Sequence, residues 1–431
     1  MLKSSFGVVI GLALLLLAPM ASAQELVAAK QEGCLRIATY NVSLNRPEQG
    51  KLREDLEAGN EQAEALAAVI RAVKPDILLL NEVDYVAGKS NAEFFAGRYL
   101  SAIKQDALGG GAIRLPYVFD APVNTGVPSG MDLNQNEKNT DPEDAWGYGR
   151  FPGQYGMAVL SRFELDKTRV RTLQKFLWSD LPDALRPQAE GKPSYYDDAT
   201  WKKLRLSSKS FWDVPIKTPL GVIHVLASHP TPPAFDGPED RNGCRNHDEI
   251  LLIQKYIEGA DFLRGDDGEP AGLGGDDSFV VMGDLNSDPA DGGSRSAAIR
   301  NLLKHPRISQ AEAPRSRGAI RAAQEQGKAN LEQSGEASRD TGDFSDRSVG
   351  NLRIDYVLPS SDLEVVSSGV FWPAVDDVPK AYREAVKECL RASHHHLVWV
   401  DVKLPEVERV CVCGLLPLWE SRKETNGEGV F

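Results

Sequence analysis

Apolar and polar residues follow two different periods along the chain, and each period predicts a different kind of element. Alternation, or a short apolar run bounded by polar turns, is typical of a β-strand. This pattern predicts strands over residues 35–41, 77–80, 155–161, 221–228, 279–282, 351–358 and 397–402. A spacing near 3.6 residues predicts helices over residues 61–72 and 245–257. The mixture of strands and helices predicts an α/β fold.

Polar residues stand where several of these strands end. Asn41 ends the first strand and Glu82 follows the second, while Asp284 and Asn286 leave the strand over residues 279–282. The carboxyl ends of strands are where α/β proteins build their sites. An acid and an amide two residues apart leave a strand end on the same side, which is an arrangement that can hold a water or a metal ion. The pattern therefore predicts a site at one end of the sheet.

Three long segments lack a clear period and are predicted to be loop insertions in a domain over residues 24–405. They cover residues 104–151, 167–211 and 310–347, and the last is either a loop or a poorly packed helix over the site. Four aromatic residues of the second segment could stack on a ligand or form a local core, and we favour the core: Trp178, Tyr195, Tyr196 and Trp201. The tail over residues 406–431 is assigned no chemistry.

The amino-terminal segment, residues 1–23, predicts a cleaved secretory signal. It has one lysine, an apolar run over residues 8–17 and the small-residue ending Ala21-Ser22-Ala23. The alternative is an uncleaved anchor, but the run is shorter than the ~20 residues that span a bilayer, and no later segment is uniformly apolar for that length. We expect the mature protein to be periplasmic or extracellular, with no transmembrane helix after cleavage.

Composition and charge narrow the possible functions. The chain is 42% hydrophobic and 26% charged, as in an ordinary folded enzyme, so disorder, collagen and coiled coil are excluded as the main architecture. Its net charge is −13, and removal of the signal would take away one lysine. A sequence-blind binder of polyanions should be basic, so strong polyanion binding is not expected. The five cysteines could pair in part in an oxidising compartment, with at least one left over.

Seven short motifs, in this order, resemble the endonuclease/exonuclease/phosphatase superfamily, which has the deoxyribonuclease I-like fold. They are Thr-Tyr-Asn at 39–41, Leu-Asn-Glu at 80–82, Tyr-Gly-Met-Ala-Val-Leu-Ser at 155–161, Ser-His at 228–229, Gly-Asp-Leu-Asn at 283–286, Arg-Ile-Asp-Tyr-Val at 353–357 and Ser-His-His at 393–395. Each motif alone is weak, whereas the ordered set is specific and covers residues 34–404. The resemblance implies a four-layer α/β/β/α sandwich with a phosphoester-cleaving site at one end of the sheets.

The resemblance also implies roles for the polar strand ends. Glu82 and Asn41 would hold a divalent ion, Mg²⁺ or Mn²⁺, which suits oxygen ligands. Asp284 and Asn286 would orient the attacking water and a phosphate oxygen. Asp355 would orient His395, which would contact the scissile phosphate or act as the base. His229 would be a candidate for protonating the leaving group. Weaker candidates for contact with the substrate, which could equally be structural, are Tyr155, Arg245, Asn246, Asp288 and His394.

This chain departs from the family pattern at two positions. Ser393-His394-His395 stands where the family has Ser-Asp-His, and Asp84 stands where deoxyribonuclease-like members carry an arginine. If His394 faces the metal, its softer imidazole should favour Mn²⁺ over Mg²⁺; the alternative is that it points outward. An anion at Asp84 argues against duplex DNA as the substrate.

The sequence therefore predicts a secreted, divalent-metal-dependent phosphoesterase. Its substrate is left open between small phosphomonoesters or diesters and nucleic acid, and its oligomeric state is also open. A secreted nuclease is the first alternative. The second is a binding module that kept the fold and lost catalysis, although the complete set of candidate catalytic residues stands against it.

Overall fold

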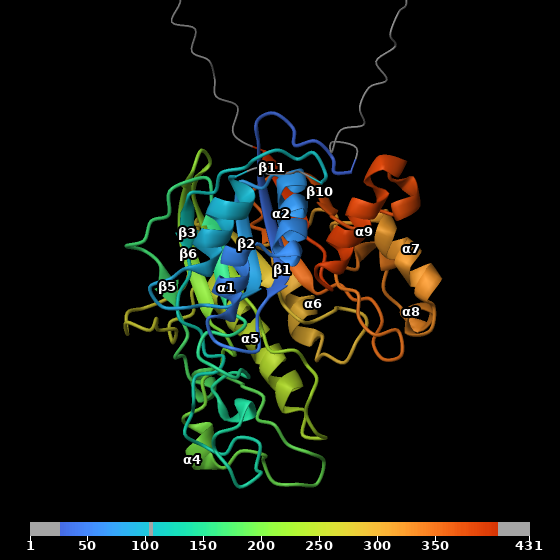
Figure 1. Ribbon diagram of the computed structural model, residues 1–431. Coiled ribbons are helices and arrows are strands. Elements are labelled where there is room, and N and C mark those ends of the chain that lie inside the picture. The colour runs from blue at the N-terminus through green and yellow to red at the C-terminus, as the bar shows by residue number, and fades with distance from the viewer. Residues whose placement is uncertain (1–25, 103–106, 404–431) are drawn as a thin grey trace, which may run out of the picture.

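The computed structural model describes residues 26–102 and 107–403 (Figure 1). The predicted signal over residues 1–23 and the tail over residues 406–431 lie outside the described residues. In the described part, no helix combines the length and the apolar composition that crossing a membrane requires.

The described strands form two sheets. The six-stranded sheet has the order β10 (Val365–Val370), β11 (Val398–Lys403), β1 (Cys34–Leu44), β2 (Ile77–Val83), β4 (Met157–Ser161) and β3 (Tyr117–Phe119). The five-stranded sheet has the order β5 (Arg171–Thr172), β6 (Phe211–Thr218), β7 (Gly221–Ser228), β8 (Ser278–Asp284) and β9 (Asp355–Pro359).

The helices flank these sheets and fill the long connections. They are α1 (Lys51–Ala58), α2 (Glu61–Val73), α3 (Asn91–Phe95), α4 (Asp198–Trp201), α5 (Arg241–Ile257), α6 (Ala297–Leu303), α7 (Arg317–Gln326), α8 (Ala329–Glu332) and α9 (Arg383–Arg391). Figure 1 shows α4 in a lobe that extends beyond the two sheets.

Alternation along the central strands divides the buried residues into layers. In β1, Ala38 and Tyr40 pack with residues of α2 and α9, whereas Ile37 faces the opposite way and packs with residues of the five-stranded sheet. In β7, Leu226 packs with α5 and α6, while Val225 joins the layer between the sheets. Because both faces of each sheet are covered, the fold is the expected four-layer α/β/β/α sandwich.

The strand register brings the polar strand ends together. β1 and β2 are parallel with Asn41 opposite Asn81, so Glu82 follows beside them. β7 and β8 are also parallel, with Ala227 opposite Met282. β9 runs antiparallel to β8 and pairs Asp355 with Asp284. The candidate residues of both sheets therefore meet at one end of the sandwich.

Gly283 makes the close approach of β7 and β8 possible at this end. Its φ is 147°, and a Cβ at this position would lie 1.9 Å from the carbonyl oxygen of Ser228. A side chain would clash with backbone here, so the residue before Asp284 has to be glycine.

The predicted elements are recovered with shifted ends. The strand over residues 221–228 is observed with the same bounds, and the helix predicted from residue 245 begins at Arg241. The strand prediction is wrong for residues 351–354, because Leu352 bonds to Thr341 and Gly342 instead of a neighbouring strand. Residue 155 also lies outside the strand that follows it, because Tyr155 has a left-handed φ of 56°.

The insertions have more local structure than their sequences indicate. The segment over residues 310–347 contains α7 and α8, with Ala319 of α7 buried in the layer between the sheets. In the segment over residues 167–211, Trp178 is buried, with its ring 5.0 Å from that of Trp201, so the aromatic residues form the expected local core.

Three of the five cysteines, Cys34, Cys244 and Cys389, lie in the described part of the chain. Cys34 and Cys244 both carry free thiols, and Cys244 is buried. Cys34 and Cys244 are therefore not joined to each other or to another described cysteine. Cys411 and Cys413 lie outside the described residues.

Candidate active site

Asp284 is the centre of the candidate site. Its Oδ2 atom accepts a hydrogen bond from Asn41 Nδ2 at 3.0 Å and lies 3.4 Å from His229 Nε2 and 3.6 Å from His395 Nε2. Asn41 belongs to the six-stranded sheet and His395 lies three residues before β11 of that sheet, whereas His229 follows β7 of the other sheet. One carboxylate oxygen thus gathers polar groups from both sheets.

The pKa of Asp284 reflects this environment. Burial alone would raise the pKa of the carboxyl, but the His395 and His229 rings and the Asn41 amide outweigh burial and hold the pKa well below its ordinary value. Asp284 is therefore ionised at neutral pH and acts as a hydrogen-bond acceptor.

His395 is held between two carboxylates. Its Nδ1 atom lies 3.0 Å from Asp355 Oδ2, and its Nε2 faces Asp284. Burial opposes a charge on this ring, but the fields of Asp355 and Asp284 prevail and raise the pKa of His395 to about 10. The ring is therefore an imidazolium at neutral pH in this arrangement, with the orientation set by Asp355.

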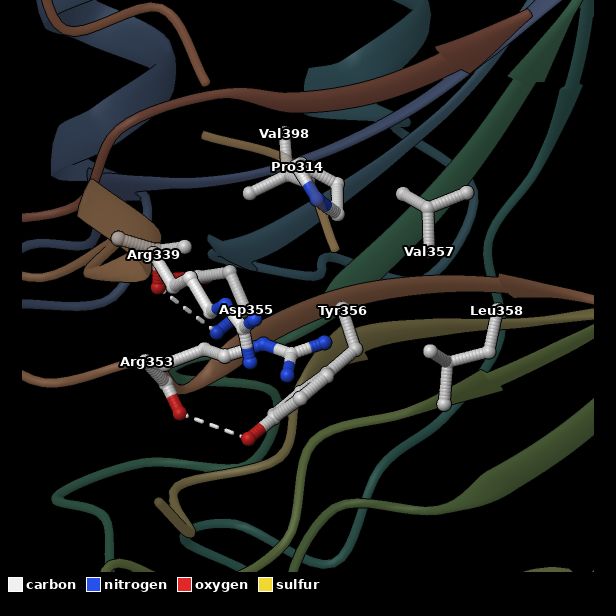
Figure 2. A pocket seen from close by; sticks show the side chains of 9 residues that line it. Pro314, Arg339, Arg353, Asp355, Tyr356, Val357, Leu358 and Val398 are labelled. Carbon is white, nitrogen blue, oxygen red and sulfur yellow. Dashed lines mark hydrogen bonds between the residues drawn. The ribbon is translucent and has the colours of Figure 1, made fainter. Parts of the chain in front are cut away.

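Thr341 fixes the Asp355 carboxylate. Its hydroxyl donates to Asp355 Oδ2 at 2.8 Å and accepts the backbone N–H groups of Ile354 and Asp355 at 3.0 Å each. A cavity of about 10 Å³, close to the size of one water, lies beside Asp355 and is lined in part by Arg339 and Arg353 (Figure 2). The Asp355–His395 pair is thus supported from the irregular segment that precedes β9.

Glu82 is the candidate metal ligand with the most open carboxylate. Asn41 Nδ2 donates to its Oε1 at 3.1 Å, and Asn45 Nδ2 donates to its Oε2 at 2.9 Å. Its φ of 61° places it in the left-handed region, where a non-glycine residue is uncommon and is stabilised by its surroundings. Among the described residues, no lysine, arginine or histidine lies within ion-pair distance of it.

These residues fit a divalent cation. Glu82, Asp284 and Asp355 bring three carboxylates to one end of the sandwich, and oxygen donors of this kind suit Mg²⁺ or Mn²⁺. A buried group of possible ligand atoms, from Asp284, Asp355 and His395, lies within 4.8 Å. Asn41 turns its amide nitrogen toward Glu82 and Asp284, while its oxygen accepts the Ser43 N–H at 3.2 Å. In this arrangement Asn41 positions the carboxylates.

Asn286 lies beside the same centre. Its backbone N–H donates to Asp284 Oδ1 at 2.9 Å, and its Nδ2 donates to the carbonyl of Pro230 at 3.1 Å. Its φ of 50° turns the chain sharply after β8. The side chain is partly exposed, so its amide can reach a bound molecule.

Arg245, Asn246 and Asp288 are engaged in internal contacts. The Arg245 guanidinium donates to backbone carbonyls of the two insertions, including Leu206 at 2.8 Å. Asn246 Nδ2 donates to the carbonyls of Thr231 and Leu285. The Asp288 carboxylate accepts backbone N–H groups, including that of Arg353 at 2.7 Å. These contacts give all three side chains a structural role.

Asp84 and Tyr155 lie next to each other. The Asp84 carboxylate accepts the backbone N–H groups of Arg46 at 2.8 Å and Tyr155 at 3.2 Å. Burial raises the pKa of Asp84 to about 7. Asp84 thus holds two loops together. Its side chain, expected as an anion near the path of the phosphate, is buried and accepts hydrogen bonds from the backbone. The half-buried Tyr155 ring lies 6.5 Å from that of the exposed Tyr148.

The three consecutive histidines have different surroundings. His395 is buried in the site, whereas the His394 side chain is exposed. His396 is buried and stacks on Trp372 with 3.8 Å between ring centroids, as a structural residue would. The exposure of His394 favours the interpretation in which it points outward.

The sequence pattern did not indicate three residues that support the site. Asn45 bonds Glu82, Thr341 bonds Asp355, and the Phe344 ring packs edge-on against His395 at 5.6 Å. Asn45 lies four residues after Asn41, directly after the end of β1, and could have been suspected. Thr341 and Phe344 lie in the irregular segment over residues 310–347, where no local signal marks them.

A comparison of the chain with models of protein families finds a match that covers the residues of the site. The model of the Endonuclease/Exonuclease/phosphatase family covers residues 38–395. The chain belongs to this family. The matched range begins within β1 and ends at His395, so it contains every residue of the Asp284 centre.

Several solved structures are similar to this family member. An endonuclease/exonuclease/phosphatase from Beutenbergia cavernae is 18% identical, with a TM-score of 0.45 over 86% of this chain and 72% of that chain. Sphingomyelinase C from Streptomyces griseocarneus is 15% identical, with a TM-score of 0.42 over 85% of this chain and 99% of that chain. The catalytic domain of human nocturnin, with bound sulfate, is 14% identical, with a TM-score of 0.40 over 87% and 96%. No curated protein matches the chain in sequence.

Proposed function

We propose that the protein is a secreted, divalent-metal-dependent phosphoesterase that hydrolyses phosphomonoester or phosphodiester bonds. The observation that carries this proposal is the convergence of His229, His395 and Asn41 on one oxygen of Asp284, with Glu82 beside it. Two imidazoles and three carboxylates at one end of a sandwich can hold a phosphoryl group, a water and the protons that move between them.

The side chains divide the work by their positions. Asp284 and Asn286 orient the attacking water and a phosphate oxygen. His395, kept protonated by Asp355, donates to a phosphoryl oxygen, and His229 is placed to protonate the leaving group. Glu82, positioned by Asn41 and Asn45, would hold Mg²⁺ or Mn²⁺. A bound divalent ion supplies charge neutralisation at the phosphoryl oxygens.

Secretion is the second part of the proposal. It is supported by residues 1–23, where the single lysine, the apolar run and the ending Ala21-Ser22-Ala23 fit a cleaved signal. Expression of the full chain in a bacterium, followed by N-terminal sequencing of the protein in the periplasm or medium, tests it. We expect the mature chain to begin at Gln24; an intact Met1 on cell-associated protein would contradict secretion.

A substrate panel tests the activity. The purified protein is treated with EDTA, reloaded with Mg²⁺ or Mn²⁺ and offered plasmid, single-stranded DNA, RNA, sphingomyelin, bis-p-nitrophenyl phosphate and p-nitrophenyl phosphate. We expect EDTA to abolish hydrolysis, either ion to restore it, and Glu82→Gln to raise the metal concentration required. The matched control is Glu332→Gln, which removes an exposed carboxylate from α8.

The outcomes separate the alternatives. Hydrolysis confined to plasmid, single-stranded DNA or RNA would identify a nuclease. Full activity in excess EDTA would remove the metal from the proposal. Binding of metal and phosphate without turnover of any substrate would identify a binding module that kept the fold.

A further inference from the structure

Lys209 lies next to the candidate site although no family motif includes it. It stands two residues before β6, in the segment that ends the second insertion. β6 pairs with β7 so that Phe211 faces Ser228, and continuing this register places Lys209 alongside His229 and Pro230. The hydroxyl of the preceding residue, Ser208, donates to the carbonyl of His229 at 3.4 Å, in agreement with this placement.

The backbone around Lys209 is tightly held. The carbonyl of Lys209 accepts the Asn124 N–H at 2.8 Å, and the Asn124 side chain donates to the carbonyl of Ser207 at 2.7 Å. Gly147 packs so closely that a Cβ there would lie 1.9 Å from the carbonyl oxygen of Ser208. The insertion over residues 104–151 therefore fixes the position of Lys209 from one side.

The Lys209 side chain is largely buried, and its ammonium has no partner among the described residues. The residue is only 6% exposed, and among the described residues its ammonium has no hydrogen-bond acceptor and no carboxylate oxygen within 4.0 Å. Both carboxylate oxygens of the nearby Glu249 accept hydrogen bonds from backbone N–H groups, those of Ser208 and Thr231, at 2.6 Å each. A largely buried cation is costly unless it is paired, so an anion that arrives from solvent would be a favourable partner for this one.

The charged groups around Lys209 relate it to the candidate site. Burial lowers the pKa of Lys209, and the opposing carboxylates are Glu249, Glu82 and Asp284. Two of these three belong to the candidate site. The ammonium is not among the buried polar atoms sealed from water, whereas His229 Nδ1 is. The ammonium thus keeps contact with solvent, and its charged neighbours include Glu82 and Asp284 of the candidate site.

We propose that Lys209 binds a non-bridging oxygen of the substrate's phosphoryl group. This inference rests on the proposed phosphoesterase function and names a residue for it. A lysine ammonium is a compact charge with three donors, and charge-assisted hydrogen bonds to phosphate oxygens are among the strong ones. Together with His395, it would supply positive charge where three carboxylates would otherwise repel an anion.

Titration calorimetry with inorganic phosphate tests the inference without requiring turnover. Phosphate is titrated into the Mn²⁺-loaded wild type, Lys209→Met, Lys209→Arg and the control Lys203→Met, which changes an exposed lysine of the same insertion. We expect Lys209→Met to weaken phosphate binding about 10-fold to 100-fold, the range of one charge-assisted hydrogen bond, with most affinity retained in Lys209→Arg. Lys203→Met should bind as the wild type does.

Two further measurements distinguish direct contact of Lys209 with phosphate from an indirect effect through the metal or the fold. Mn²⁺ titrated alone should bind Lys209→Met at least as tightly as it binds the wild type, because the variant loses a cation near Glu82. In the wild type, phosphate should protect Lys209 from acetylation by acetic anhydride, as read by mass spectrometry, and leave Lys203 unprotected. This second experiment is independent of whether a variant folds.

Unchanged phosphate affinity in folded Lys209→Met, or acetylation of Lys209 that phosphate does not slow, would overturn the inference. Phosphate binding that depends on Lys209 in a protein that hydrolyses no substrate of the panel would uphold it and reject the proposed activity. Failure of the two proposals is therefore distinguishable.

Discussion

At His395, burial and charge act in opposite directions and charge prevails. The ring is buried, which favours the neutral form, yet Asp355 and Asp284 raise its pKa to about 10. A residue with a free pKa near 6.5 is therefore cationic over the whole physiological range. This state suits a group that donates to a phosphoryl oxygen, since no change in pH near neutrality removes its proton.

The Asp355→Asn variant tests this balance. Removing one carboxylate while burial stays should lower the pKa of His395 and reduce the rate by about 10² to 10⁴. NMR titration of the imidazole in the metal-free protein measures the shift. The stabilising contribution of the charged pair is fully present below about pH 6.5 and is lost as the pH rises through about 10 in the wild type. An unchanged His395 titration in Asp355→Asn would contradict the pairing.

The neighbouring His394 leads to the opposite prediction, that its substitution has little effect on activity. Because its side chain is exposed, His394→Asp should leave the Mg²⁺ and Mn²⁺ activation curves within about 2-fold of wild type, as for a surface substitution. Metal titrations of the two proteins side by side measure this. A marked gain in Mg²⁺-supported activity would show that the imidazole faces the metal and that its softness sets the ion preference.

At the scale of elements, the segment between α8 and β9 supports the site through one hydroxyl. Thr341→Val would leave two buried N–H groups, of Ile354 and Asp355, without their acceptor, at a cost of about 1–3 kcal/mol each. We expect lower stability in urea and a lower kcat. Thr341→Ser keeps the hydroxyl and is the matched control. Equal urea midpoints for the two variants would show that the hydroxyl is dispensable.

The sequence predicted the strands and helices better than the residues that hold the site side chains in place. β7 was predicted with its observed ends because its apolar run is bounded by a glycine and a stiff proline turn. Asp284 was singled out because it follows an apolar strand, and Asp355 because residues 353–357 resemble a family motif. Thr341 and Lys209 could not be found in the same way, since their roles depend on contacts with residues distant in the chain or on tertiary placement. The carbonyl partners of Arg245 could not be predicted either, since they come from two insertions that only the tertiary fold brings together.

At the scale of the whole molecule, charge sets which substrates can collect on the surface. The chain carries a net charge of −13, and the positive groups of the site are few and enclosed. We predict no gel shift of plasmid DNA at up to about 100 µM protein in about 150 mM salt, where non-specific DNA binders already associate. A shift that disappears as salt increases would reveal a local basic groove and favour the nuclease alternative.

The hydrogen bond between Asn41 and Asp284 joins two different sheets, and it exists at only one relative position of those sheets. Residues that never contact a substrate, such as Ile37 and Trp212 in the layer between the sheets, therefore help set the spacing of the reacting groups. A displacement of about 1 Å can cost on the order of 10² in rate. Natural selection on turnover would thus restrict this inner layer as strongly as selection on folding does, and variants there should lose activity before they lose structure.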